Sequence, residues 1–163
     1  MKDRKAVPGL IGEIEKHQQV LLRLVALYRD FTAKHPEWSR IDTETAMAAA
    51  QLFANYYTCI ETIFFRISSF FENNLEKDRW HAHLLERMQC AIPGERPAVI
   101  DDRTGADLME FLKFRHFTRY YFDFNYDREK LAFLGNKFKR TAEAIEGDLR
   151  TFISYLRALS NRS

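Results

Sequence analysis

The chain has 163 residues and a formal net charge of +2, with only six glycines and four prolines. This length suits one domain with one core, and the scarcity of glycine and proline favours long helices over a turn-rich β fold. The two cysteines, Cys59 and Cys90, are too few for a disulfide framework. The net charge is too small to indicate a nucleic-acid-binding protein by itself, so any basic site must come from local clustering.

The amino-terminal stretch is basic, but Glu13, Glu15 and Lys16 interrupt its apolar part, which argues against a signal peptide. No apolar run approaches the ~18 residues that a membrane-spanning helix needs. These features predict a soluble protein in the reducing cytoplasm.

Apolar residues at helical spacing predict a first helix from about residue 9 to 34. The segment His35–Trp38 ends this helix, because its proline pushes the preceding residue out of helical geometry. Asp42 or Thr43 can cap a second helix that continues to about residue 73. This helix is apolar on more than one side, so we expect it to lie centrally or to meet a partner.

A short amphipathic helix is predicted over residues 78–90, and the proline-containing stretch 91–102 should form a loop. Thr104 and Asp107 resemble a capping box that opens the next helix, which fades near Asp123.

The last helix is predicted to begin after Asp127 and to continue to about Leu159. The sequence contains no glycine-rich phosphate loop, internal repeat or low-complexity tail. We therefore expect an all-α fold, an antiparallel bundle of four long helices plus one short helix, in a single domain that spans residues 1–163.

Metal-ligating patterns are weak. His81 and His83 are two residues apart in the short helix, so at ~100° per residue they point to nearly opposite sides. No third ligand lies at a suitable spacing, and we expect no metal or other cofactor. The two histidines are interpreted as surface residues beside Trp80. The basic run Asn136–Arg140 is interpreted as a solvated helix face.

Three carboxylates are candidate functional groups. Asp101 and Asp102 lie in the predicted loop and are interpreted as solvated. Glu61 lies in the apolar part of the second helix, where a buried carboxylate would need a cationic or hydrogen-bonding partner. An arginine of the segment 114–122 is one candidate, which would make Glu61 an orienting group. An exposed glutamate on a wet edge of the helix is the alternative.

The segment Phe114–Phe122, FRHFTRYYF, places two arginines and a histidine among five aromatic residues. On a helical wheel Arg115 and Arg119 share one apolar side, and a second aromatic side faces away from it. One side can enter the core, and a two-fold symmetry mate is the economical partner for the other.

Two copies of Arg115, His116 and Arg119, with Lys113 nearby, would line one cleft in such a dimer. The cleft would attract phosphate, and its rings could stack on bases. Alternatively, the arginines bind interface carboxylates such as Glu61.

Several segments resemble the HepT-like branch of the HEPN families. They are Asn55–Ile67 (NYYTCIETIFFRI), Trp80–Met88 (WHAHLLERM), Ile92–Ile100 (IPGERPAVI) and Phe114–Leu131 (FRHFTRYYFDFNYDREKL), within Ala49–Leu159. The resemblance implies a helical bundle that pairs into a two-fold dimer. It also implies metal-independent ribonuclease activity in active members, many of which are toxins of toxin–antitoxin pairs. The usual partner is a minimal nucleotidyltransferase, which can neutralise the toxin by attaching AMP to a motif tyrosine.

The family motif is an arginine, four residues, a histidine, one residue and a tyrosine. Arg115 matches its arginine, but Tyr120 occupies the histidine position and Phe122 the tyrosine position. Histidine suits proton transfer near neutrality, whereas tyrosine, with an ordinary pKa of about 10, is a poor base there. Phe122 cannot accept AMP, so Tyr120 is the expected acceptor. His116 lies one turn before Tyr120 and could replace the missing proton-transfer group.

We therefore predict a dimeric HepT-like protein that binds RNA or nucleotide and a partner protein, with weakened or lost ribonuclease activity. The alternatives are an active metal-independent ribonuclease and a purely structural dimeric interaction protein. The predicted site residues are Arg115, His116 and Tyr120 for catalysis, Arg115, Arg119 and Lys113 for phosphate binding, and Glu61 for orientation.

Overall fold

The computed structural model describes residues 6–72 and 80–161, and in these ranges it contains helices and no strand. The elements are α1 (Val7–Lys34), the 3-10 turn η2 (Trp38–Arg40), α2 (Thr43–Phe71), α3 (Trp80–Gln89), α4 (Asp102–Tyr120) and α5 (Arg128–Ser160). The predicted all-α bundle of four long helices and one short helix is confirmed. The short helix is predicted to begin at residue 78, and residues 78 and 79 lie outside the described residues. A membrane-spanning helix is not found within the described ranges.

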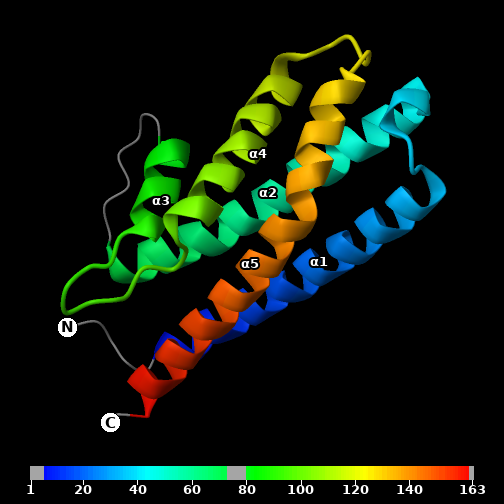
Figure 1. Ribbon diagram of the computed structural model, residues 1–163. Helices are drawn as coiled ribbons and strands as arrows, with labels where there is room; N and C mark the ends of the chain where they lie inside the picture. Colours follow the sequence, from blue (N-terminus) through cyan, green and yellow to red (C-terminus); the bar gives the residue numbers. More distant parts are fainter. Residues whose placement is uncertain (1–5, 73–79, 162–163) are drawn as a thin grey trace.

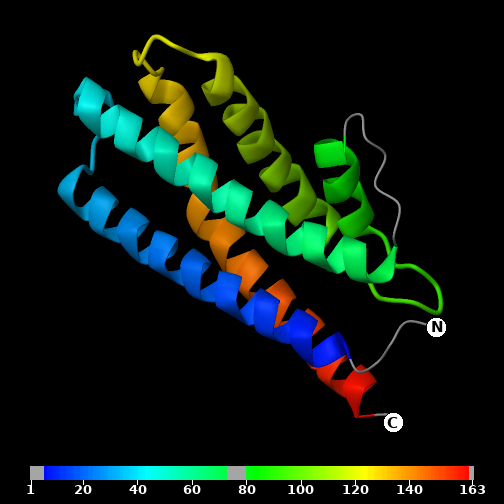
Figure 2. The same ribbon diagram turned by 180° about the vertical axis from the view of Figure 1, so that it is seen from behind.

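The long helices α1 and α2 form an antiparallel pair, and α5 lies along α1 in the opposite direction (Figure 1). Helix α4 packs on α2 and α5, and the short α3 lies at the side of the bundle against α2 and α4 (Figure 2). The start of α1 and the end of α5 therefore meet at one end of the molecule.

Aspartates open three of the helices. Asp42, Asp101 and Asp127 each accept a hydrogen bond from a backbone N–H two or three residues later. Such caps satisfy donors that a helix leaves unpaired in its first turn. The caps predicted at Asp42 and Asp127 are confirmed. The capping box predicted from Thr104 and Asp107 is wrong, because Asp101 caps α4 and Asp107 turns towards α5.

The core is rich in aromatic rings that meet around Phe138 of α5. The Phe138 ring centroid lies 4.2 Å from that of Tyr28 on α1 and 4.7 Å from that of Tyr56 on α2. Phe53 and Phe111 complete this cluster. Because α2 contacts every other α-helix, its apolar residues are buried on several sides, as the sequence predicts for a central helix.

Candidate functional site

Glu61 of α2 and Arg115 of α4 form a buried bidentate ion pair. Arg115 Nη1 donates to Glu61 Oε1 at 2.8 Å, and Nη2 donates to Oε2 at 3.0 Å. Glu61 is 6% and Arg115 3% exposed, so both charges are removed from water and depend on each other. The interpretation that Glu61 pairs with an arginine of residues 114–122 is thus confirmed by the contact.

The remaining contacts of Arg115 fix the position of its guanidinium group. Nη1 also donates to Thr58 Oγ1 at 3.3 Å, and the Tyr57 ring centroid lies 5.0 Å from Cζ. Nε is buried and has no hydrogen-bond partner among the described residues. A buried donor without a partner is uncommon in folded proteins and often marks a functional position.

His81 of α3 belongs to the same cluster. Its Nδ1 lies 2.7 Å from Glu61 Oε2 and 3.2 Å from Arg115 Nη2. The interpretation of His81 as a surface histidine is wrong, because α3 packs against α2 and α4 and places this half-buried side chain against the buried Glu61. The tautomer with its proton on Nδ1 donates to Glu61 and has Nε2 as its acceptor, whereas the other tautomer accepts at Nδ1 from Arg115 Nη2.

A signal for His81 was present in the sequence. His81 precedes Leu84, Leu85 and Met88, the three buried residues of α3, by three, four and seven residues. These spacings place it on the buried face of the helix.

His116 and Tyr120 continue this arrangement to the protein surface. The His116 ring centroid lies 6.3 Å from that of His81 and 6.3 Å from that of Tyr120. His116 is exposed, Tyr120 is 73% exposed, and Phe122 is 85% exposed. The cluster therefore runs from the buried Glu61 through two histidines to an exposed tyrosine.

A polar cavity of about 400 Å³ lies beside Arg115, between α2, α4 and the segment that follows α4. Its lining includes Gln51, Asn55, Thr58, Arg115 and Arg119. The volume is within the range of sites for small ligands. The structure thus brings the predicted phosphate-binding residues Arg115 and Arg119 to one cavity. Lys113 does not line it; this exposed residue lies 3.5 Å from Glu110.

Four exposed rings at the end of α4 and just after it are called the aromatic patch here. They are Phe117, Tyr120, Phe122 and Phe124. Tyr121 differs from them, since it is half-buried, stacks on Phe117 and donates its hydroxyl to the carbonyl of Asn125 at 3.0 Å. These rings are close together in the chain, and exposed rings that share one face commonly form an interaction surface.

The basic run Asn136–Arg140 has a structural role that its interpretation as a solvated face missed. Lys137 and Arg140 donate hydrogen bonds to the buried carboxylate of Asp107. Burial alone would raise the pKa of Asp107, but the hydrogen bonds from Arg140 and Lys137 outweigh it and lower that pKa. Lys137 and Arg140 thus join α5 to α4, and these two cations are not available to a phosphate-binding surface.

The fold and the site define a helical-bundle protein whose central helices hold a buried Glu–Arg pair beside exposed histidine and aromatic side chains. A family model described as HepT-like protein matches residues 48–156, which is more than half of the chain. The chain therefore belongs to the HepT-like family. Comparisons with curated proteins and with solved structures gave no match.

Proposed function

We propose that this protein is the HepT-like half of a two-component toxin–antitoxin-type module, with a minimal nucleotidyltransferase as its partner. It binds RNA or nucleotide, and its ribonuclease activity is weakened or lost. This proposal rests on the residues that occupy the three positions of the family motif. The family arginine, Arg115, is held by Glu61, whereas the family histidine and tyrosine positions present Tyr120 and Phe122 to solvent.

Metal-independent cleavage of RNA requires a group that removes the proton from the 2′-hydroxyl and a group that protonates the leaving oxygen. Phe122 can do neither, and tyrosine is a weak base at neutral pH. Arg119, which is exposed and lines the polar cavity, can still bind a phosphate, because arginine donors match the geometry of phosphate oxygens. The residues that remain thus favour binding over cleavage.

A second copy of the chain is the proposed neighbour of the aromatic patch, as the family resemblance implies. Two-fold pairing there would cover the exposed rings and bring two copies of His116 and Arg119 together. Sedimentation at micromolar concentration should give twice the chain mass. Replacing Phe117 and Phe122 by Ser should give monomers, whereas Phe133→Ser, an exposed ring on α5, should not. If the natural protein is monomeric, the proposal that two copies form a shared cleft is wrong.

RNA binding can be tested through Arg119, because this exposed residue lines the polar cavity and has no ion pair among the described side chains. Arg119→Gln should weaken RNA binding and reduce its salt dependence, and Lys113→Gln should do so to a smaller extent. Arg23→Gln, on exposed α1 surface, is the matched control. Unchanged affinity in Arg119→Gln would favour the purely structural interaction protein.

AMP transfer should occur at Tyr120. The hydroxyl of Tyr121 is already bonded to Asn125, whereas the Tyr120 side chain is largely exposed. Intact-mass analysis after incubation with a minimal nucleotidyltransferase and ATP should show one added AMP, absent in Tyr120→Phe and retained in Tyr121→Phe. Modification of Tyr121 instead would show that the proposed cleft beside His116 and Arg119 is not the site of AMP transfer.

An active ribonuclease is the second candidate, and the cluster of Glu61, His81 and His116 favours it. Glu61 would orient His81, whose Nε2 could accept a proton, and His116 is the nearby exposed histidine. If the natural protein cleaves RNA, His81→Asn and His116→Ala should each change the pH profile of cleavage. Cleavage that is insensitive to both changes would exclude this assignment.

A further inference from the structure

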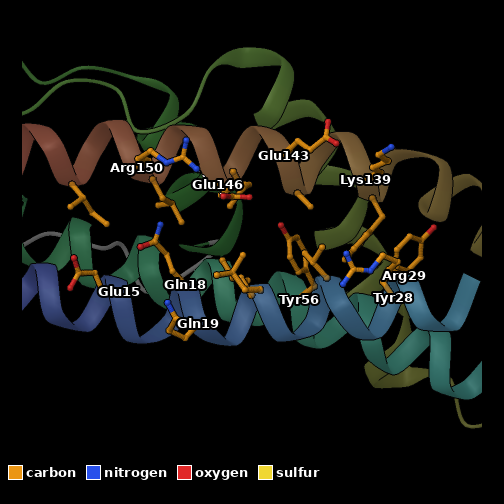
Figure 3. Close-up of a pocket in the computed structure, with 18 of the residues that line it drawn as sticks. Glu15, Gln18, Gln19, Tyr28, Arg29, Tyr56, Lys139, Glu143, Glu146 and Arg150 are labelled. Atoms are coloured by element: carbon orange, nitrogen blue, oxygen red, sulfur yellow. Dashed lines mark hydrogen bonds and ion pairs between the residues drawn. The ribbon is translucent and has the colours of Figure 1, made fainter.

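Two hydrogen bonds join helices α1 and α5, and a pocket lined by both helices lies between these bonds. At one end Arg157 donates to Glu15 at 2.8 Å, and at the other Tyr28 donates its hydroxyl to the Gly135 carbonyl at 2.8 Å. Glu15 and Tyr28 are thirteen residues apart on α1, which corresponds to about 20 Å at the helical rise. Figure 3 shows the space that remains between these contacts, called the α1–α5 groove below.

The α1–α5 groove has a volume of about 590 Å³. Its lining includes aliphatic side chains on both helices, Leu21, Leu22 and Val25 on α1 and Ala142, Ile145, Leu149 and Ile153 on α5. Polar and charged side chains also line the groove, among them Gln18, Gln19 and Arg29 on α1 and Lys139, Glu143 and Glu146 on α5. An apolar groove of this size with a few polar groups is typical of sites for small organic ligands. Its two closed ends favour an elongated molecule of limited length.

Tyr56 of α2 forms the floor of the groove. The residue is only 1% exposed, and its hydroxyl points into the space between α1 and α5 (Figure 3). No hydrogen bond between described residues involves this hydroxyl. Burial raises the pKa of Tyr56 well above its ordinary value, so the group remains a protonated donor. A buried donor without a protein partner is expected to meet an acceptor from a ligand or from water.

The position of Tyr56 shows which end of the groove is polar. Phe138 packs against both Tyr56 and Tyr28, so Tyr56 lies towards the end that the Tyr28–Gly135 hydrogen bond closes. Arg29 lines the groove at this same end.

The charges along the rim differ between the two ends. Arg157 pairs with Glu15 at the far end, and Arg150 pairs with Glu146 along α5. Arg29 takes part in no ion pair among the described residues. In Figure 3 the carboxylate of Glu143 is directed away from α1. The charge of Glu146 also reaches Tyr56, but this carboxylate is paired with Arg150. The Tyr28 end therefore offers the Tyr56 hydroxyl and the Arg29 guanidinium group to an anion, and the cation of Lys139 lines the same groove.

We propose that the α1–α5 groove binds an elongated anionic amphiphile of the fatty-acid class. The carboxylate accepts a hydrogen bond from Tyr56 and pairs with Arg29, and the alkyl tail lies along the aliphatic walls towards the Glu15–Arg157 contact. This site is separate from the polar cavity beside Arg115, so it does not depend on the function proposed above.

Isothermal titration of the purified full-length protein with dodecanoate tests the site. We expect saturable binding of one molecule per chain. Tyr56→Phe should weaken it about tenfold or more, because the lost hydrogen bond is made to a charged group. Tyr57→Phe is the matched control, since Tyr57 is equally buried but does not line the groove. Arg29→Gln should also weaken binding, and Arg23→Gln should not.

Two further titrations make the proposal refutable. Ala142→Phe adds a ring to the groove wall and should abolish binding, provided that its circular dichroism matches that of the natural protein. Undiminished binding by this variant, or no saturable binding by the natural protein, would overturn the site. Dodecanol, which has a similar tail and no charge, should bind more weakly than dodecanoate. Equal affinities would overturn the assignment of an anionic ligand.

Discussion

Arg115 and Glu61 bury opposite charges against each other between α4 and α2, where both side chains are almost completely removed from solvent. Bringing two charges out of water costs free energy that their attraction offsets only while both are present. The pair therefore contributes more to fixing the relation of the two helices than to net stability.

Removing Glu61 should show how far the buried charge of Arg115 depends on it. Glu61→Leu should lower the free energy of unfolding by about 3–5 kcal/mol, because the guanidinium group stays buried without a counter-charge. The double change Glu61→Leu with Arg115→Met should recover most of this loss. Urea denaturation followed by circular dichroism measures both. A loss below about 1 kcal/mol in the single variant would show that water reaches Arg115.

Asp148 of α5 provides a pH-dependent test. Its Oδ2 atom is buried and has no hydrogen-bond partner in the described part of the chain. Burial, together with the nearby Asp101 charge, raises the pKa of Asp148. The folded state therefore favours the protonated form, and this residue's contribution to stability falls as the pH rises from the unfolded-state pKa, about 3.9, through the folded-state pKa.

Asp148→Asn should therefore stabilise the protein at pH 7, by less than about 1 kcal/mol because solvent screens this half-exposed side chain. At pH 3 the carboxyl is protonated in the natural protein, so the two proteins should have similar stability there. Thermal unfolding at both pH values gives the comparison. A hydrogen bond from Thr104 lowers the pKa of Asp148 in part, so a variant that is less stable at pH 7 would indicate that this bond outweighs the cost of burial.

At the scale of the helices, most boundaries could be predicted because local chemistry sets them. Pro36 ends the first helix, and the aspartates Asp42 and Asp127 open later ones through hydrogen bonds within a few residues. Contacts between helices were harder to predict. The pairing of Asp107 with Lys137 and Arg140 joins residues thirty or more positions apart, and it depends on how α4 packs on α5.

Gly135 and Gly147 of α5 differ in packing, so replacing each by alanine distinguishes the effect of helix propensity from that of packing. A Cβ atom at Gly135 would lie 2.6 Å from the Trp38 ring and 2.9 Å from the Tyr28 hydroxyl, whereas nothing lies within 4 Å of one at Gly147. Gly147→Ala should stabilise the protein by up to about 1 kcal/mol, in line with helix propensity. Gly135→Ala should destabilise it by about 1–3 kcal/mol, because the rings must move. Thermal unfolding of both variants checks this, and stabilisation by both would show that α5 can shift away from η2.

For the molecule as a whole, the sequence predicted the bundle, because it follows from helical periodicity. It offered the pairing of Glu61 with an arginine as one of two alternatives, because an unpaired buried charge is costly, and the structure shows this contact. It did not predict the contact of His81 with Glu61 or the α1–α5 groove. Both depend on the relative positions of whole helices, which local patterns do not determine.

The central claim is that this HepT-like protein binds but does not efficiently cleave RNA. Incubation of the purified protein with transfer RNA in the presence of a chelator tests it most directly. We predict little or no cleavage by the natural protein. Tyr120→His combined with Phe122→Tyr should increase the rate by about 10²–10⁴-fold, since both positions are exposed beside Arg119 and His116. Efficient cleavage by the natural protein, abolished by His81→Asn or His116→Ala with the fold retained, would contradict this account.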